Sequence, residues 1–119
     1  MRVFRILNCP QVAMPAVPLI AALLLMLCGP SAQATGIYWT NQLASTIGRA
    51  NLDGTGVNES FIKGAQAPCG IAVDAKHIYW TNFGAQSTGT TIGRANLDGT
   101  GSNEHFVSSA NGPCRVAIG

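Results

Sequence analysis

The chain has 119 residues, of which 47% are hydrophobic and only 10% are charged. No charged residue occurs between Arg5 and Arg49, and the segment from Thr35 onward carries five basic and five acidic residues. This neutral balance excludes the basic footprint of a nucleic-acid-binding protein, and 14 glycines with few aromatic residues exclude a helical bundle or coiled coil.

The first 34 residues have the layout of a secretory signal peptide. Two arginines near the start are followed by an apolar run that is densest over 19–27, and Ala32-Gln33-Ala34 supplies small residues for a signal peptidase. We therefore expect a helical signal peptide over 1–34, with cleavage after Ala34. Residues 35–119 would then be secreted, either to the periplasm or to the cell exterior.

Two other forms of membrane targeting fit the N-terminal segment less well. A signal anchor needs about 20 uninterrupted apolar residues, whereas Pro15 and Pro18 shorten the apolar run here. A lipoprotein needs small residues before the lipid-accepting cysteine, and Met26-Leu27 before Cys28 are too large.

The segment from residue 35 onward contains two copies of one unit. Eleven residues from Thr46 to Gly56 recur letter for letter as Thr91 to Gly101, at an offset of 45 residues. Ile37–Asn41 recurs as Ile78–Asn82, at an offset of 41. An identity of this length establishes an internal repeat.

One connection accounts for the difference between the two offsets. Four residues (42–45) separate the two motifs in the first copy and eight (83–90) separate them in the second. Repeat 1 therefore covers about 37–74 and repeat 2 about 78–119, and the copies differ mainly in this connection.

Short runs of β-branched and aromatic residues predict the secondary structure of the unit. In the second copy the expected strands are 70–74, 77–81, 91–96 and 103–107, with Leu97–Gly101 as a tight turn before the last strand. Four short antiparallel strands in a period of 41–45 residues are typical of a β-propeller blade. The sequence therefore predicts an all-β fold of propeller blades.

The repeated motifs resemble a known family. Tyr38-Trp39-Thr40-Asn41 and Tyr79-Trp80-Thr81-Asn82 are similar to the YWTD signature of low-density-lipoprotein-receptor class B propellers, a pattern also used by bacterial secreted propellers. The fourth position is Asn where the family has Asp, so it lacks the negative charge. The resemblance implies a six-bladed propeller in intact members, usually used for protein recognition or scaffolding.

The predicted strands make up about two blades. The segment would hold three strands of one blade, four of the next, and an eighth strand at Val116-Ala117-Ile118. A closed propeller has about 4–8 blades, so we expect this chain to be a piece of a longer propeller. Copies assembled into a ring, such as three chains making six blades, are one alternative, and a lone fold with a marginal core is the other.

One end of the blades is the expected binding face. Because successive strands alternate in direction, connection 83–90 lies at the same end as connections 64–68 and 108–113. Variable loops on a rigid scaffold are where repeat proteins change partners. The candidate binding-loop residues are Phe83, Gln86, Ser87 and Thr88, and a merely tolerated insertion is the alternative.

Cys69 and Cys114 occupy equivalent positions in the two copies, and each follows a proline. A secretory compartment permits a disulfide, which requires Cα atoms within about 7 Å. Equivalent points on adjacent blades come that close only near the propeller axis. We therefore expect buried thiols, with a disulfide as the alternative.

The other polar residues of the motifs recur, which indicates a role in architecture. We expect Arg49 and Arg94 to pack between blades and Asp53 and Asp98 to form turns. The two tryptophans are expected in packing between blades rather than in a sugar site. The histidines do not recur and are too few for a metal site.

These features predict a non-enzymatic, secreted propeller segment for protein recognition or scaffolding. Its expected partners are another protein, further blades or its own copies, with no nucleic acid, and membrane contact is expected only through the signal peptide. No catalytic, cofactor or metal residues are predicted. The alternatives are a cell-envelope propeller enzyme, such as a lyase or hydrolase, and a non-functional truncated remnant.

Overall fold

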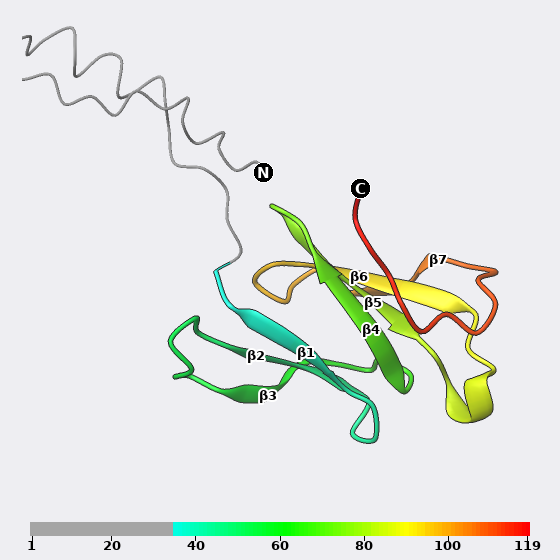
Figure 1. Cartoon of the computed structure of the whole chain (residues 1–119), viewed down its shortest axis with the longest axis horizontal. Coiled ribbons are helices and arrows are strands. Elements are labelled where there is room, and N and C mark those ends of the chain that lie inside the picture. Colours follow the sequence, from blue (N-terminus) through cyan, green and yellow to red (C-terminus); the bar gives the residue numbers. More distant parts are fainter. Residues whose placement is uncertain (1–34) are drawn as a thin grey trace, which may run out of the picture. The chain divides into compact units, whose positions relative to one another are not determined.

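A computed structural model describes residues 35–119, which form two antiparallel sheets (Figure 1). The first sheet has three strands in the order β1-β2-β3, and the second has four in the order β4-β5-β6-β7. Within each sheet, strands that follow one another in the sequence are paired. The strand bounds are β1 (Ile37–Asn41), β2 (Thr46–Ala50), β3 (Asn58–Lys63), β4 (Pro68–Val73), β5 (His77–Asn82), β6 (Thr91–Asn96) and β7 (Asn103–Val107).

The described part of the chain is therefore all-β, as the sequence predicts, and it contains no α-helix. The four strands expected in the second copy are formed, with shifts of one or two residues at some ends. The predicted signal peptide over 1–34 and its cleavage site lie outside the described residues.

The eighth strand expected at 116–118 is a wrong prediction. The residues just before this segment lie against β4, since a Cβ atom added at Gly70 would overlap the backbone of Cys114 (Figure 1). Residues 116–118 carry no strand pairing. A strand needs a neighbour that exchanges backbone hydrogen bonds with it, and no described strand lies beside 116–118 in that way. The described residues thus form seven strands.

Both sheets place a tryptophan across from a glycine. Trp39 is opposite Gly48 in the β1–β2 pair, and Trp80 is opposite Gly93 in the β5–β6 pair. A Cβ atom at either glycine would overlap the facing indole ring. Glycine is required at both positions because the indole lies flat on the neighbouring strand.

The two sheets pack through opposite faces. We call the face that carries Trp39 or Trp80 the indole face of its sheet, and the face that carries Tyr38 or Tyr79 the tyrosine face. The tyrosine face of the first sheet covers the indole face of the second, where Tyr38 Oη donates to the carbonyl of Leu97 at 3.3 Å. The core between them is formed by Ile47, Ile62, Ala65, Ile78, Trp80 and Ala95, none more than 4% exposed.

A polar network surrounds the buried Trp80. Its indole N–H donates to Glu104 Oε2 at 3.1 Å, and the Asn82 amide donates to the same oxygen at 3.1 Å and to Thr91 Oγ1 at 2.9 Å. The buried indole N–H is therefore satisfied, as burial of a polar group requires. Glu104 Oε1 is buried and has no hydrogen-bond partner among the described residues.

The first sheet repeats this network at its surface. Trp39 and Asn41 both donate to Glu59 Oε2 at 2.9 Å. The shared carboxylate explains the Asn in the fourth motif position, because an amide donates to Glu whereas an Asp carboxylate would repel it. The two glutamates recur in the sequence, but their role as acceptors for Trp and Asn emerges only from the pairing of strands.

Replacing Trp80 by Ala is expected to destabilise the fold by about 3–5 kcal/mol, because the indole is fully buried and leaves a cavity. Trp39→Ala is the matched control, since Trp39 has the corresponding neighbours in the first sheet, Gly48 and Glu59, but is partly exposed. It should cost less, about 1–2 kcal/mol. Chemical denaturation of both variants measures the difference, and equal losses would contradict the assigned burial.

Candidate binding pocket at the 83–90 connection

A pocket of about 480 Å³ lies at the end of the second sheet, beside the 83–90 connection. Segments from three connections meet there, from 64–68, 83–90 and 108–113. The pocket is lined by Gln66, Gly84, Ala85, Thr88, Gly89, Thr90, Thr91, His105, Ser108 and Ser109. The structure thus places a cavity at the end of the sheet where the sequence predicts the binding face.

Backbone hydrogen bonds hold the 83–90 connection in place. Gly89 N donates to the carbonyl of Phe83 at 2.7 Å, which closes the loop on itself, and Gly84 N donates to Gln66 at 3.0 Å. A side chain at Gly89 would collide with backbone atoms of Asn82 and Phe83. Glycine at 89 therefore allows the longer connection to fold back onto the sheet.

The segment after β7 forms the opposite wall of the pocket. Ala110 N donates to the carbonyl of Thr90 at 2.8 Å, and Gly112 N donates to that of Gly89 at 3.0 Å. These bonds join two connections that are far apart in the sequence. They give the pocket two walls tied together by backbone.

Strained backbone conformations gather at this end of the sheets. Among the described residues, the non-glycine positions with positive φ all lie in connections at this end: Ser45, Ala67, Gln86, Ser87 and Ser109. Positive φ is uncommon outside glycine and costs free energy. Such strain often accompanies functional loops, and here it gathers where the pocket lies.

The pocket offers hydrogen bonds without acid–base pairs. Its lining contributes hydroxyls from Thr88, Thr90 and Ser108, an amide from Gln66 and the imidazole of His105, and it includes no carboxylate. General acid–base catalysis usually needs a second titratable group placed against the first. The lining is therefore suited to binding polar, uncharged groups such as backbone amides and hydroxyls.

The predicted binding-loop residues reach the pocket unequally. Thr88 lines it, whereas Gln86 and Ser87 lie at the exposed tip of the loop, in the short 3-10 turn η2 (Ala85–Ser87). Phe83 is half-buried and accepts the backbone hydrogen bond that closes the loop. Only one of the four residues therefore touches the cavity.

His105 is a pocket residue that was not predicted from the sequence. His105 corresponds to Ser60 in the first copy, so it is one of the few polar positions at which the copies differ. Ser108 and Ser109 lie in connection 108–113, which the sequence places at this end, but neither was among the four candidate residues. For His105 the available signal was the departure from the repeat, because pocket residues need not serve the architecture.

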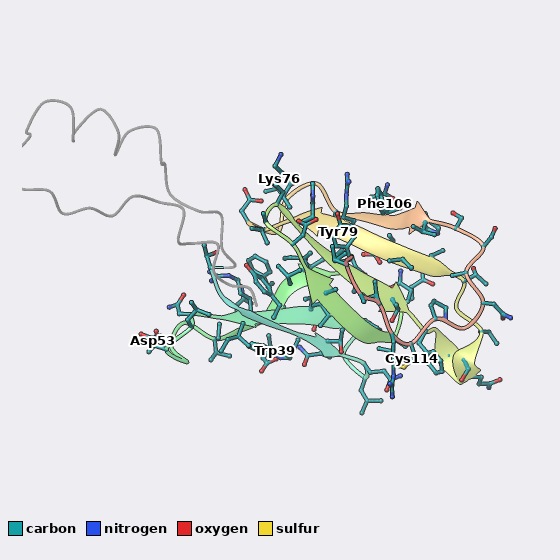
Figure 2. The ribbon with its side chains drawn as sticks, turned by 45° about the horizontal axis from the view of Figure 1, so that its top comes forward. Trp39, Asp53, Lys76, Tyr79, Phe106 and Cys114 are labelled. Carbon is teal, nitrogen blue, oxygen red and sulfur yellow. A yellow bond between two sulfur atoms is a disulfide. The ribbon has the colours of Figure 1, made fainter. Side chains whose placement is uncertain are left out.

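Cys69 and Cys114 form a disulfide, with their Cα atoms 4.9 Å apart. The buried thiols expected from the sequence are thus a wrong prediction, and the alternative is the one the structure shows. The reason is the path of the C-terminal segment, which lies against β4 and brings equivalent points of successive units together. Figure 2 shows Cys114 beside β4.

The recurring arginines lie on the tyrosine faces of their sheets. The guanidinium carbon of Arg49 lies 5.6 Å from the ring centre of Phe61, and that of Arg94 lies 4.1 Å from the ring centre of Phe106. Phe106 also packs near Tyr79, with ring centres 6.0 Å apart (Figure 2). Both arginines therefore stack on aromatic rings.

The recurring aspartates form turns. Asp53 Oδ1 accepts from the backbone N and the hydroxyl of Thr55, at 3.0 and 2.7 Å, and Asp98 does the same with Thr100, at 2.9 and 2.6 Å. Both carboxylates are engaged within their own loops. Their side chains serve the turns rather than the pocket, and Figure 2 shows Asp53 in its turn of the first sheet.

Within residues 35–119, no three His, Cys, Asp or Glu side chains gather as metal ligands would. No helix in the same stretch has the length and apolar character that a membrane span requires. No protein-family model matches this sequence, and a comparison with curated proteins finds no relative.

The stability of the fold is expected to fall in acid. Hydrogen bonds from the backbone N–H groups of Lys76 and His77, both 2.7 Å, and from the Tyr79 hydroxyl lower the pKa of Asp74 from its ordinary value of 3.8. A lowered folded-state pKa means that the carboxylate stabilises the fold above 3.8, and that this contribution is lost as pH falls through the folded pKa.

The variant Asp74→Asn isolates this contribution. We expect the melting temperature of the wild type to exceed that of Asp74→Asn above about pH 5 and the gap to close as pH falls. Thermal melts across this pH range test the expectation. A gap of constant size at every pH would show that the carboxylate charge plays no part.

Proposed function

We propose that this chain is a secreted β-propeller-repeat protein that recognises a protein partner through the end of the sheets formed by connections 83–90 and 108–113. The observation that carries the proposal is the coincidence at that end of a pocket, the one connection that differs in length between copies, and the strained backbone. Scaffolding by further blades would use the uncovered sheet faces and would leave this end of the sheets free.

The packing of the two sheets supports the assignment to propeller blades. Each sheet is a meander of neighbouring strands with the same internal register, and the sheets stack through opposite faces in the order of the sequence. Propellers repeat four-stranded sheets radially in this manner. The resemblance of the Tyr-Trp-Thr motifs to class B propellers points to the same architecture.

The composition of the pocket favours recognition over catalysis. Its lining combines hydroxyl, amide and imidazole groups with backbone at Gly84 and Gly89, and it lacks an acid to pair with His105. A lyase or hydrolase would place unique acid, base or metal-binding residues around one cavity. A polar, neutral lining suits the exposed backbone and polar side chains of a protein loop.

Secretion is the second part of the proposal, and it predicts the form of the mature protein. The N-terminal sequence of the secreted chain should begin at Thr35, because Ala32-Gln33-Ala34 precedes the expected cut. Thiol titration after denaturation should find no free thiol, since Cys69 and Cys114 are paired and the other two cysteines leave with the leader. Recovery of the chain with Met1 in the membrane fraction would contradict both expectations.

Shortening the variable connection is expected to abolish partner binding without unfolding the protein. The first copy supplies the replacement, because its four residues Gln42–Ser45 connect β1 and β2, the counterparts of the strands β5 and β6 that 83–90 connects. The immobilised protein should retain a partner from an extracytoplasmic extract of the producing cells, and the loop-swapped variant should retain at least tenfold less by quantitative mass spectrometry.

Two point variants sharpen this test. Thr88→Arg fills the pocket from one wall and should lose the partner as the loop swap does. Lys76→Ala is the control, because Lys76 lies in the β4–β5 turn at the other end of the sheet (Figure 2). Circular dichroism verifies the fold of each variant. If the wild type and the loop-swapped variant retain equal amounts of the partner, the proposed recognition surface is wrong.

A further inference from the structure

Two sheet faces are not covered by any described strand. The indole face of the first sheet exposes Ile37 by 46%, and the tyrosine face of the second sheet exposes Phe106 by 41% and Val107 by 40%. An exposed apolar face on a repeat protein is one that neighbouring repeats normally cover. The two faces lie on different sheets and are of opposite kinds.

The repeat shows what each uncovered face can bind. Ile37 corresponds to Ile78 at the offset of 41, and Ile78 is 0% exposed beneath the first sheet. Val107 corresponds to Ile62 at the offset of 45. Ile62 belongs to the first sheet and is only 3% exposed, because it packs against the second sheet. The exposed residues are thus copies of residues that the chain already buries between its own sheets.

One aromatic contact makes the correspondence concrete. A Cβ atom at Gly99 would lie 3.0 Å from the ring of Phe61, so this ring packs on the turn of the second sheet. The equivalent turn at Gly54 has nothing within 4 Å of the same position. Phe106, the counterpart of Phe61, is exposed. The uncovered face of the second sheet therefore has an aromatic ring, Phe106, with no turn packed on it. The uncovered face of the first sheet has a turn, at Gly54, with no ring packed on it.

We infer that copies of this chain associate head to tail, with the tyrosine face of the second sheet of one copy packed on the indole face of the first sheet of the next. This inference rests on the proposed propeller stacking, because it extends the packing seen within the chain to a packing between chains. The partner is a second copy of this chain. Its contacts repeat those of the internal interface, with Phe106 of one copy on Gly54 of the next.

The segment 116–118 then completes the first sheet of the next copy. In the second sheet β4 pairs with β5 so that Ile71 lies opposite Trp80 and Val73 opposite Ile78. The same register places Val116 opposite Trp39 of the next copy and Ile118 opposite its Ile37. This pairing supplies the neighbour that 116–118 lacks, and it turns the three-stranded sheet into one of four strands.

Such an interface is heterologous, so it forms a ring when the rotation between copies closes. Each copy contributes two sheets, so a closed propeller of about 4–8 blades needs about two to four copies. The mass of the native assembly counts the copies.

Three aliphatic-to-lysine variants test the interface by native mass spectrometry of the secreted protein. Ile37→Lys places a charge on one uncovered face, and Val107→Lys places one on the other. Leu43→Lys is the control, because Leu43 is fully exposed in the β1–β2 connection and lies on neither face. The wild type and the control should be oligomers, and the two face variants should be monomers with native circular dichroism.

Mixing the two face variants gives the decisive result. Ile37→Lys protein retains an intact tyrosine face and Val107→Lys protein retains an intact indole face, so the mixture should form a one-to-one dimer and nothing larger. Leu52→Lys and Phe106→Ser replace them if either variant fails to fold, since Leu52 is 67% exposed and its counterpart Leu97 packs against the core between the sheets.

Three outcomes would overturn the inference: a monomeric wild type with native circular dichroism, an oligomer that both face variants leave intact, or a mixture that remains monomeric. The loop-swapped variant leaves both faces unaltered and should assemble as the wild type does. A monomeric wild type that still binds its partner would therefore end this inference while the proposed recognition function stands.

Discussion

Two requirements of the buried indole of Trp80 determine much of the packing of the fold. The indole must be shielded from water, which requires the first sheet on one side and a glycine on the facing strand. Its N–H must be hydrogen-bonded, which requires a carboxylate from β7. Strands β5, β6 and β7 are therefore fixed relative to one another around a single ring, and the packing of the two sheets follows from the need to cover it.

The same requirements explain which parts of the fold could be predicted. Strands, turns and repeat boundaries follow from local patterns, so the sequence places β5, β6 and β7 to within about two residues, within the usual uncertainty of element ends. Gly93 has no side chain, so a hydrophobic pattern does not show which face of its strand is buried at this position. In the structure it is a regular buried position, because the space belongs to the ring of Trp80.

Features that depend on the path of the chain in space could not be predicted. The disulfide requires the C-terminal segment to lie against β4, and nothing local in the residues around Cys114 specifies that path. The pocket depends on backbone hydrogen bonds between two connections. Such bonds can form with any side chains, so the sequence does not indicate them. The end of the sheet that holds the pocket was nevertheless predictable, because strand direction alternates and one connection differs in length.

Comparison of the two copies separates residues of the framework from residues of the pocket. Residues that recur, such as Arg49 and Arg94 or the paired aspartates, stack on rings or close turns. Residues that differ, such as His105 and Thr88, line the pocket. A duplicated unit therefore keeps its framework while one copy acquires a distinct surface, and the differences between copies identify that surface better than any motif does.

Gly48 and Gly93 allow each sheet to be destabilised separately, which tests whether the two sheets unfold cooperatively. A methyl group at Gly93 would displace the ring of Trp80, which is enclosed by protein. A methyl group at Gly48 would displace the ring of Trp39, which is partly exposed to solvent. The two alanine substitutions are chemically identical and differ only in which sheet they disturb. Comparing their hydrogen-exchange patterns would reveal whether the sheets melt together or whether one survives the loss of the other.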